Sequence, residues 1–406
     1  MRMHGSIYIR GKRNKIMANN RNSRKRRKKK KSRKLLLFVF EVLLLAILLL
    51  VAYFVSMMNR IKYEDLDESE AGINSDMNED TILSLEGYTN IALFGLDNRS
   101  SNNYDRGNSD VIMIASINNE TKEIKLVSVY RDTYLSIGNG AYNKANAAYA
   151  HGGAKQAVQM LNSNLDLDIK EYACVDWAAM VEVIDDLGGL DLEITEGEMN
   201  QINKYKKDVD LVTGKSTPNV TQYGLVHLDG TQATTYARIR KLAGDDFKRA
   251  SRQRIVLQAI MEKAKKADFG TLTNICNSVI DDISTSLSIT QILGLAKDVA
   301  SYSIASTTGF PFELTTKNLT GSGDTVIPAE LAQNVKELHQ YMFDDAVYTP
   351  SSTVQTISDA IVYKTGITAD SALINTSDYN ETAGATGTDG IKKSTDTESD
   401  TGTATN

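Results

Sequence analysis

The stretch from residue 110 to residue 129, DVIMIASINNETKEIKLVSV, contains two apolar runs on either side of a polar segment. Residues 110–117 and 124–129 each match a buried β-strand, and the NNET segment between them (residues 118–121) is typical of a hairpin turn. A third short apolar run, NIALFG at residues 90–95, ends in a glycine and matches another buried strand. The three segments together predict the centre of a β-sheet.

Helical patterns follow this sheet region and alternate with further strand candidates. Residues 154–161 and 177–187 match helices, and the second ends at Gly188-Gly189, which is a helix stop signal. Residues 190–194 alternate like a strand, and the polar residues 200–227 are expected to form an excursion or insertion. Further helices are expected at residues 231–240, 247–266, 287–302 and 329–343, with a strand at 309–314. Because strands and helices interleave, the predicted fold class is α/β: an α/β/α sandwich with a central mixed sheet.

The N-terminal 58 residues differ from the rest in charge and hydropathy. Residues 1–34 contain sixteen of the 46 Lys and Arg residues and no acidic residue, which leaves 30 basic against 51 acidic residues, a net charge of −21, for the remainder. Residues 35–58 (LLLFVFEVLLLAILLLVAYFVSMM) carry one charge, Glu41, and are long enough for a single transmembrane helix. A cleaved signal peptide is the alternative, but the segment is too long and no clear cleavage site follows it.

The basic run predicts the orientation of this anchor, because Lys and Arg stay on the cytoplasmic side of a membrane. Residues 1–34 are then a basic cytoplasmic tail, and the bulk of the chain lies outside, as in a single-pass type II protein of the cell membrane. The tail could instead bind nucleic acid, but the anionic inner leaflet is nearer and suffices. We therefore expect a membrane partner and no nucleic acid.

Composition sets the other boundaries. Residues 59–85 are polar and acidic and are expected to form an extracellular spacer, followed by a folded domain over residues 86–345. Residues 346–406 are rich in Ser, Thr and Asp and are expected to form a largely disordered tail. The two cysteines, Cys174 and Cys276, and the scattered histidines do not form a zinc-binding pattern, and the cysteine spacing does not argue for a disulfide.

A cluster of arginines lies in residues 228–254, LDGTQATTYARIRKLAGDDFKRASRQR. Five arginines surround the acidic pair Asp245 and Asp246: Arg238, Arg240, Arg249, Arg252 and Arg254. Planar guanidinium groups suit phosphate oxygens, and Arg249 shares a face with Gln253 if that segment is helical. The alternative is a surface helix with ordinary salt bridges.

Two aspartates flank the predicted strands. Asp97 follows the first strand and Asp110 opens the second. Two carboxylates brought together at one sheet edge would repel unless a cation neutralised them, and Mg²⁺, which prefers oxygen ligands, or an arginine would do so. Arg99 and Arg131 lie close by in the sequence. Taken singly, each aspartate could also be a turn residue or a helix cap.

Six segments, in order along residues 88–262, resemble the LytR–CpsA–Psr family of membrane-anchored cell-wall enzymes. They are NIALFGLDNR, GNSDVIMIASI, VSVYRDTYLSI, YNKANAAYAHGG, VIDDLGGLDLEI, and LDGTQATTYARIR with GDDFKRASRQ. The resemblance implies an α/β/α sandwich with a large apolar lipid pocket. It also implies a Mg²⁺-assisted phosphotransferase of a Gram-positive-type envelope, which moves an anionic glycopolymer, such as teichoic acid or capsular polysaccharide, from a polyprenyl-pyrophosphate carrier to peptidoglycan.

The resemblance also assigns roles to single residues. The metal-binding aspartates of the family match Asp97 and Asp110. The positions that bind pyrophosphate match Arg99, Arg131, Arg238, Arg240, Arg249 and Gln253. The residues expected to act in catalysis are Arg131, Asp132, Asp246 and Arg249. Asp132 and Asp246 are candidates for the general base, although we favour the role of orienting an arginine for both.

Three positions depart from the family pattern. Asn108 stands where the family usually has an arginine, Tyr130 replaces the usual proline before Arg131, and Lys248 stands where glycine is common. We expect Tyr130 to loosen its turn and the change at Asn108 to remove one partner for an anion.

Three apolar helical segments, residues 158–161, 178–187 and 255–261, could line the lipid pocket or belong to the core, since periodicity does not separate the two. Two other functions use the same residues: a polyprenyl-pyrophosphate hydrolase, with water in place of the sugar, and a non-catalytic regulator that binds lipid or polymer. A DNA-binding regulator is a third alternative, which an exterior location of the main domain would exclude.

Overall fold

The computed structural model describes residues 60, 62–96, 107–242, 245–345 and 347–379. The basic tail, the predicted transmembrane segment, Asp97 and Arg99 lie outside the described residues. No helix within the described ranges is long and apolar enough to span a membrane.

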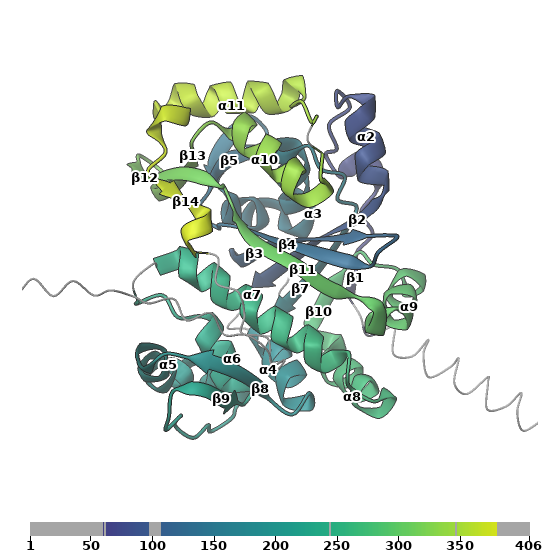
Figure 1. Ribbon diagram of the computed structural model, residues 1–406, viewed down its shortest axis with the longest axis vertical. Coiled ribbons are helices and arrows are strands. Elements are labelled where there is room, and N and C mark those ends of the chain that lie inside the picture. The colour runs from purple at the N-terminus through teal and green to yellow at the C-terminus, as the bar shows by residue number, and fades with distance from the viewer. Residues whose placement is uncertain (1–59, 61, 97–106, 243–244, 346, 380–406) are drawn as a thin grey trace, which may run out of the picture. The chain divides into compact units, whose positions relative to one another are not determined.

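A seven-stranded sheet forms the centre of the fold (Figure 1). In spatial order its strands are β1 (Lys62–Tyr63), β10 (Ile283–Thr285), β7 (Glu171–Asp176), β2 (Tyr88–Leu96), β3 (Ser109–Asn118), β4 (Glu123–Val129) and β11 (Ser303–Phe310). The strands β2, β3 and β4 pair antiparallel, whereas β7 runs parallel to β2 and β11 parallel to β4. The predicted mixed sheet and its three central strands are therefore confirmed.

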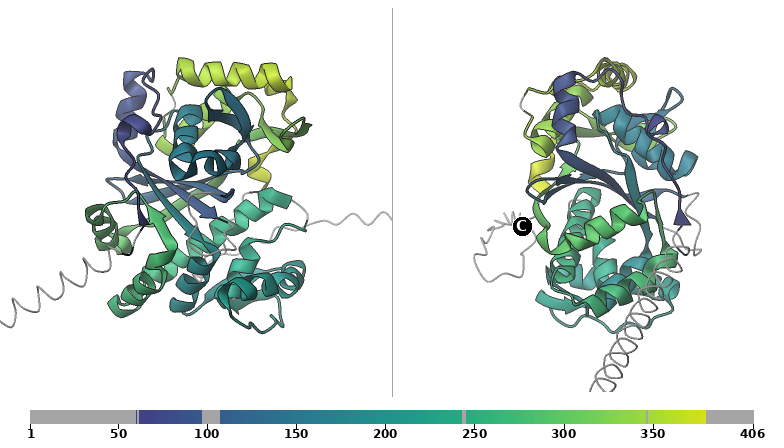
Figure 2. Two further views of the ribbon diagram at one scale, coloured as in Figure 1. Left: turned by 180° about the vertical axis from the view of Figure 1, so that it is seen from behind. Right: turned by 90° about the vertical axis from the view of Figure 1, so that its right-hand side faces the viewer.

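Helices cover both faces of this sheet (Figures 1 and 2). One side carries α2 (Glu79–Glu86), α3 (Ala145–Leu165), α10 (Leu331–Phe343) and α11 (Ser352–Thr365). The other carries α4 (Trp177–Asp186), α6 (Gly230–Ala237), α7 (Asp245–Ala264) and α8 (Phe269–Val279). In β2, Ala92 and Phe94 belong to the apolar cluster around α3, whereas Ile91 and Leu93 face the cluster that includes α7 residues. This alternation is why the strands read as continuous apolar runs.

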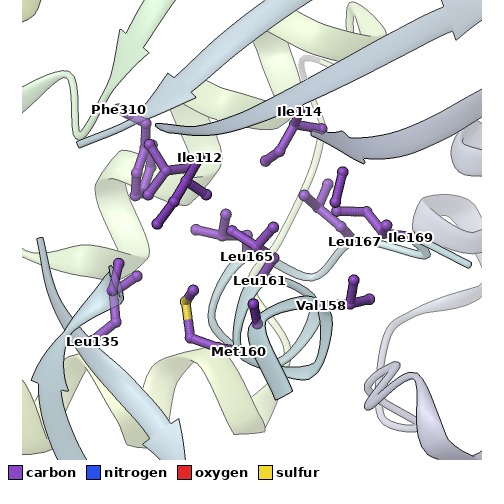
Figure 3. Packing of buried hydrophobic residues seen from close by; sticks show 14 of the residues in the cluster. Ile112, Ile114, Leu135, Val158, Met160, Leu161, Leu165, Leu167, Ile169 and Phe310 are labelled. Atoms are coloured by element: carbon purple, nitrogen blue, oxygen red, sulfur yellow. The ribbon is translucent and has the colours of Figure 1, made fainter. Parts of the chain in front are cut away.

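The larger apolar cluster lies between the sheet and α3, and Figure 3 shows part of it. Val158 and Leu161 are fully buried there beneath Ile112 and Ile114. Residues 255–261 of α7 are also packed, because Val256 contacts the cluster around α6 while Leu257 lies against the sheet. These apolar segments, which the sequence left open between core and pocket wall, therefore contribute to the core.

Residues 200–227, which were expected to form an excursion or insertion, belong to a smaller lobe with regular secondary structure. The strands β8 (Leu190–Ile194) and β9 (Gly224–Leu228) pair antiparallel, and α5 (Glu196–Thr213) lies between them in the chain. Helix α5 begins with a capping box and buries Ile202 and Val209 on one face. Helix α5 was not predicted because only one narrow face of it is apolar, so its average composition is that of a loop.

The predicted domain boundaries were also wrong at both ends. The expected spacer contains α2, whose Leu85 is buried in the core, together with a buried Leu66. The expected disordered tail contains α11, which buries Val354, Ile357 and Ile361. Their spacing of three and four residues is helical, but the surrounding Ser and Thr obscured it.

Several elements were shorter than expected or were missed. The expected helix over residues 287–302 is α9 (Ile289–Lys297) followed by a 3₁₀ turn. The expected strand over residues 309–314 is interrupted at Pro311, where β11 ends and β12 (Glu313–Leu319) begins. Strand β12 pairs with β13 (Gly323–Pro328) and β14 (Ile374–Asn375) in a small second sheet. Strand β7 and helix α8 were not predicted.

A buried aspartate ties the ends of the domain together. Asp166 follows α3 in the left-handed conformation, and its carboxylate is fully buried. It accepts hydrogen bonds from Asn74 Nδ2 at 2.6 Å, Tyr348 Oη at 2.6 Å, and Ser351 N and Oγ at 2.8 and 2.7 Å. A buried charge needs such donors, so the N-terminal segment, α3 and α11 are fixed to one another at this point.

The histidine beside this network predicts a pH dependence of stability. His339 is buried, bonded through Nε2 to the Leu165 carbonyl at 2.9 Å and stacked on Tyr348 at 3.7 Å. Burial lowers its pKa from 6.5 to about 4. Between these values the unfolded state binds more protons, so the free energy of unfolding should fall by about 3 kcal/mol as the pH drops from 6.5 to 4.

Urea unfolding of the full-length protein between pH 7 and pH 4 measures this loss. The variant His339→Gln, which keeps a donor for Leu165 but does not titrate, should lack that share of the pH dependence. Equal slopes for the two proteins would contradict the assignment.

Candidate active site

Four strand ends meet at one edge of the central sheet. Leu96, the last residue of β2, pairs with Ser109, the first residue of β3, and also with Asp176, the last residue of β7. Strand β4 ends at Val129 on the same edge, because it runs antiparallel to β3. Asp110 and Arg131 are therefore brought together. Leu96, which precedes Asp97 in the sequence, pairs with Ser109, which precedes Asp110.

The carboxylate of Asp110 is the centre of the cluster. Its Oδ1 lies 2.7 Å from Nη1 of Arg131, and its Oδ2 lies 3.0 Å from Nη2 of Arg240. Arg249 donates from Nη2 to the main-chain carbonyl of Asp110 at 3.3 Å. Three guanidinium groups from separate parts of the chain thus converge on one residue at the start of β3.

Asp246, in the first turn of α7, contacts the same three arginines. Its oxygens lie 3.0 Å from Arg249, 3.5 Å from Arg131 and 3.6 Å from Arg240. The pair with Arg249 spans three residues of the helix, which places both side chains on one face. The arginines are therefore held between two carboxylates rather than left to repel one another.

Burial strengthens this electrostatic coupling. Burial alone would raise the pKa of Asp110, but the charges of Arg249, Arg131 and Arg240 outweigh it and hold the pKa below its ordinary value. Burial lowers the pKa of Arg249 to about 10, which leaves it cationic at neutral pH. For Arg131, burial is outweighed by Asp110, Asp246 and Asp132, and its pKa is raised.

Lys144 adds a fourth cation that the sequence analysis did not assign. Its ammonium lies 2.9 Å from Oδ1 of Asp132, whose Oδ2 lies 3.4 Å from Nε of Arg131. Lys144 belongs to the segment YNKANAAYAHGG, so the only sequence signal was its place in that segment. With Lys144, the cluster contains four cations and three carboxylates.

The other three arginines of residues 238–254, which are Arg238, Arg252 and Arg254, each have different surroundings. Arg238 lies with its guanidinium 3.9 Å from the centre of the Trp177 ring. Arg252 is buried and pairs with Glu198 at 2.7 Å, which joins α7 to α5. Arg254 is almost fully buried, and its charge acts on Tyr130. The pair with Glu198 assigns Arg252 a structural role.

Two cavities adjoin the cluster and share Asp110, Arg249 and Gln253. The first, of about 130 Å³, is lined by charged and polar side chains on one part and by apolar side chains on another. Its apolar lining comprises Ile112, Val129, Tyr130, Phe247, Ala250 and Val326. The second, of about 280 Å³, is aromatic and charged. Its lining includes Trp177, Tyr205, Asp208, Arg238, Arg240 and Lys241.

Tyr130 does not loosen its turn, contrary to expectation. Its main-chain N–H donates to the Phe310 carbonyl at 3.0 Å, a bond that the proline typical of the family could not make. Its hydroxyl donates to Thr376 Oγ1 at 3.2 Å, and burial raises its pKa to about 12. The turn that carries Arg131 is therefore fixed by other contacts. Asn108, the other departure near the site, is exposed.

The donor chemistry of the cluster suits Mg²⁺ only in part. No group of three or more His, Cys, Asp or Glu side chains that could hold a metal occurs in the part of the chain that the structure describes. Protein Mg²⁺ sites, however, often use one or two carboxylates together with phosphate oxygens and water. Asp110 offers such oxygens, although both now face arginines.

Comparison with known proteins agrees with this architecture. Relatives include the polyisoprenyl-teichoic acid–peptidoglycan teichoic acid transferases TagU of Enterococcus faecalis and TagV of Bacillus subtilis. The TagU match is 30% identical and covers 52% of this chain and 65% of the relative; the TagV match is 24% identical and covers 72% and 73%. The solved structure of TagT bound to LIIa-WTA shares the fold, with a TM-score of 0.53 and 23% identity over 70% of this chain and 96% of that one.

The family model described as the LytR_cpsA_psr family matches residues 52–340, more than two thirds of the chain. The resemblance carried by the six sequence segments is thus confirmed, and the chain belongs to the LytR–CpsA–Psr family.

Proposed function

We propose that the chain transfers an anionic glycopolymer of the teichoic acid type from a polyprenyl-pyrophosphate carrier to peptidoglycan. The observation that carries the proposal is the convergence of Arg131, Arg240 and Arg249 on Asp110 and Asp246. The names of the relatives, which are teichoic acid transferases, support the same reaction.

The cluster suits a diphosphate because its cations are partly buried and already oriented. Each guanidinium has five N–H donors, so Arg131 and Arg240 retain donors beyond those directed at the carboxylates. Arg249 is only 4% exposed, and a phosphate oxygen beside it would be little screened by water. The diphosphate would take the place of some carboxylate contacts while the arginines keep their positions.

In the proposed reaction, a sugar hydroxyl oxygen of the acceptor attacks the phosphorus that bears the glycopolymer. The new P–O bond forms as the bond to the bridging oxygen of the diphosphate breaks, and polyprenyl phosphate leaves with the electron pair. The hydroxyl proton passes to a basic site or to water. Catalysis of such a transfer consists mainly of positioning and charge stabilisation, which the arginines supply.

Asp132 and Asp246 act, in this proposal, as positioning residues rather than as general bases. Asp132 is held between Lys144 and Arg131, and Asp246 contacts three arginines. Mg²⁺, held by Asp97, Asp110 and oxygens of the diphosphate, would supply further charge neutralisation.

The two cavities suggest how the substrates lie. The apolar wall of the first cavity, with Ile112, Val129 and Phe247, suits the first isoprene units of the carrier. The half-buried ring of Tyr205 and the ammonium group of Lys241, 5.9 Å from the ring centre, line the second cavity, and the ammonium group of Lys204 lies 5.4 Å from the same ring. Aromatic rings and basic groups together suit a saccharide with an anionic substituent. Residues 35–58 would hold the site beside the membrane that contains the carrier, with the catalytic domain outside the cell.

A reconstituted reaction tests the function and the role of Arg131. The full-length protein, Mg²⁺, a synthetic polyprenyl-pyrophosphate disaccharide and peptidoglycan should give wall-linked saccharide. Arg131→Lys should lower kcat/KM by about 100-fold, because a point charge does not replace a forked donor. Arg60→Lys, the same exchange at an exposed arginine, is the control. Free saccharide phosphate as the main product would favour the hydrolase, and binding of the donor without any product would favour the regulator.

The metal assignment has its own test. Asp97→Ala should abolish the Mg²⁺-dependent part of turnover and leave the circular dichroism spectrum and the melting temperature unchanged, because the residue is assigned only to the ion. The dependence of rate on Mg²⁺ concentration, compared with the wild type, is the measurement. An unchanged Mg²⁺ dependence in the variant would remove Asp97 from the metal site.

The saccharide cavity is tested by fluorescence, since Trp177 is the only tryptophan of the chain and lines that cavity. A soluble anionic oligosaccharide of the acceptor type should change its emission. Tyr205→Ala should weaken binding roughly 3- to 10-fold, the worth of one aromatic contact. Tyr363→Ala, at a ring that is 90% exposed on α11, should bind as the wild type does. Equal affinities for the three proteins would place the saccharide elsewhere.

A further inference from the structure

Three aromatic rings form a stack beside the arginine cluster. Phe247 of α7 lies with its ring centre 4.7 Å from that of Tyr130, edge to face at 85°, and 5.1 Å from that of Tyr379, stacked at 29°. Tyr379 ends the short 3₁₀ turn Thr376–Tyr379, which lies beside the start of α7 (Figure 1). The stack therefore joins the end of β4, the start of α7 and the C-terminal segment.

Two of these rings are next in sequence to the charged residues of the site. Tyr130 precedes Arg131, and Phe247 follows Asp246. The ion pair between Arg131 and Asp246 is 3.5 Å long and links the same two backbone segments that the rings hold together. Packing between Tyr130 and Phe247 thus sets how closely these two segments approach.

The C-terminal segment is firmly held where it meets the stack. Thr376 is fully buried; its N–H donates to the Phe312 carbonyl at 2.8 Å, and its hydroxyl donates to the Pro311 carbonyl while accepting from Tyr130. Strand β14, just before it, pairs with β12. These contacts fix the backbone three residues before Tyr379, whose ring stacks on Phe247.

The residues around Tyr130 leave room for its side chain to reach the C-terminal segment. A Cβ added to Gly309 would lie 2.2 Å from the Tyr130 hydroxyl, so only glycine leaves room for that side chain. The proline that the family usually has at this position would supply no N–H, no aromatic ring and no hydroxyl. The segment that completes the arrangement lies beyond residue 340, where the match to the family ends.

We propose that Thr376 and Tyr379 are positioning residues of the active site, and that the C-terminal segment braces the Arg131 turn and the first turn of α7 through the Tyr130–Phe247–Tyr379 stack. The inference rests on the proposed function for its activity readout. The rings take no part in the reaction itself. They act by packing, which holds the two charged backbone segments at the separation that a diphosphate needs. A displacement of about 1 Å at such a site costs up to 100-fold in rate.

Tyr379 allows a clean test because its ring is partly exposed and its removal leaves the core intact. In the full-length protein, Tyr379→Ala should lower kcat for transfer roughly 10- to 100-fold, with little change in the melting temperature or in KM for the donor. Tyr379→Phe keeps the ring contact and should retain wild-type kcat. Tyr363→Ala removes an exposed tyrosine elsewhere and is the matched control.

Other outcomes would overturn the inference. A kcat for Tyr379→Ala equal to that of the Tyr363→Ala control would remove the segment from the site. Equal losses in Tyr379→Ala and Tyr379→Phe would assign the effect to the hydroxyl, and a fall in melting temperature that accounts for the loss would make the role structural. Failure of the proposed function is distinguishable, because the wild type itself would then give no transfer product.

Discussion

The site depends on one carboxylate at the edge of the sheet. Asp110 contacts Arg131 and Arg240 through its two side-chain oxygens and Arg249 through its carbonyl. Without the Asp110 carboxylate, the three guanidinium groups that contact this residue would repel one another. A partly buried charge without a partner also costs free energy. Asp110 and Asp246 thus allow the protein to keep its cations in place before an anion arrives, which is the preorganisation that electrostatic catalysis requires.

Strand order explains why Asp110 stands where it does. Strand β3 begins at the edge at which β2, β4 and β7 end, so a residue at its start meets residues that follow three other strands. Helix α7 then brings Asp246 and Arg249 from a segment more than a hundred residues away. In open α/β folds, parallel strands gather ligand-binding residues at their carboxyl ends. In this fold the central antiparallel strands gather the charged residues at one end of the sheet.

The sequence was informative where burial on both sides made a segment continuously apolar, and where acidic and basic residues followed such segments. The strands β2, β3 and β4 were predicted on that basis, whereas α5 and α11 were missed because each buries one narrow face among polar residues. Arg238 and Arg240 were both expected to bind pyrophosphate and to lie in a helix over residues 231–240, yet α6 ends at Ala237, so the two do not follow helical spacing. One lies on Trp177 and the other reaches Asp110, a division that only the backbone at the end of the helix determines.

The departures from the family pattern show how a local loss is compensated by distant parts of the chain. A proline before Arg131 would restrict the backbone by its own ring. Tyr130 leaves the backbone freer, but it gains a main-chain hydrogen bond to Phe310, a hydroxyl contact to Thr376 and an aromatic contact to Phe247. Each of these contacts is non-local and depends on residues that a short motif does not include. The rigidity of the turn is thus a property of the assembled domain, since Phe310 ends β11 and Thr376 lies in the C-terminal segment.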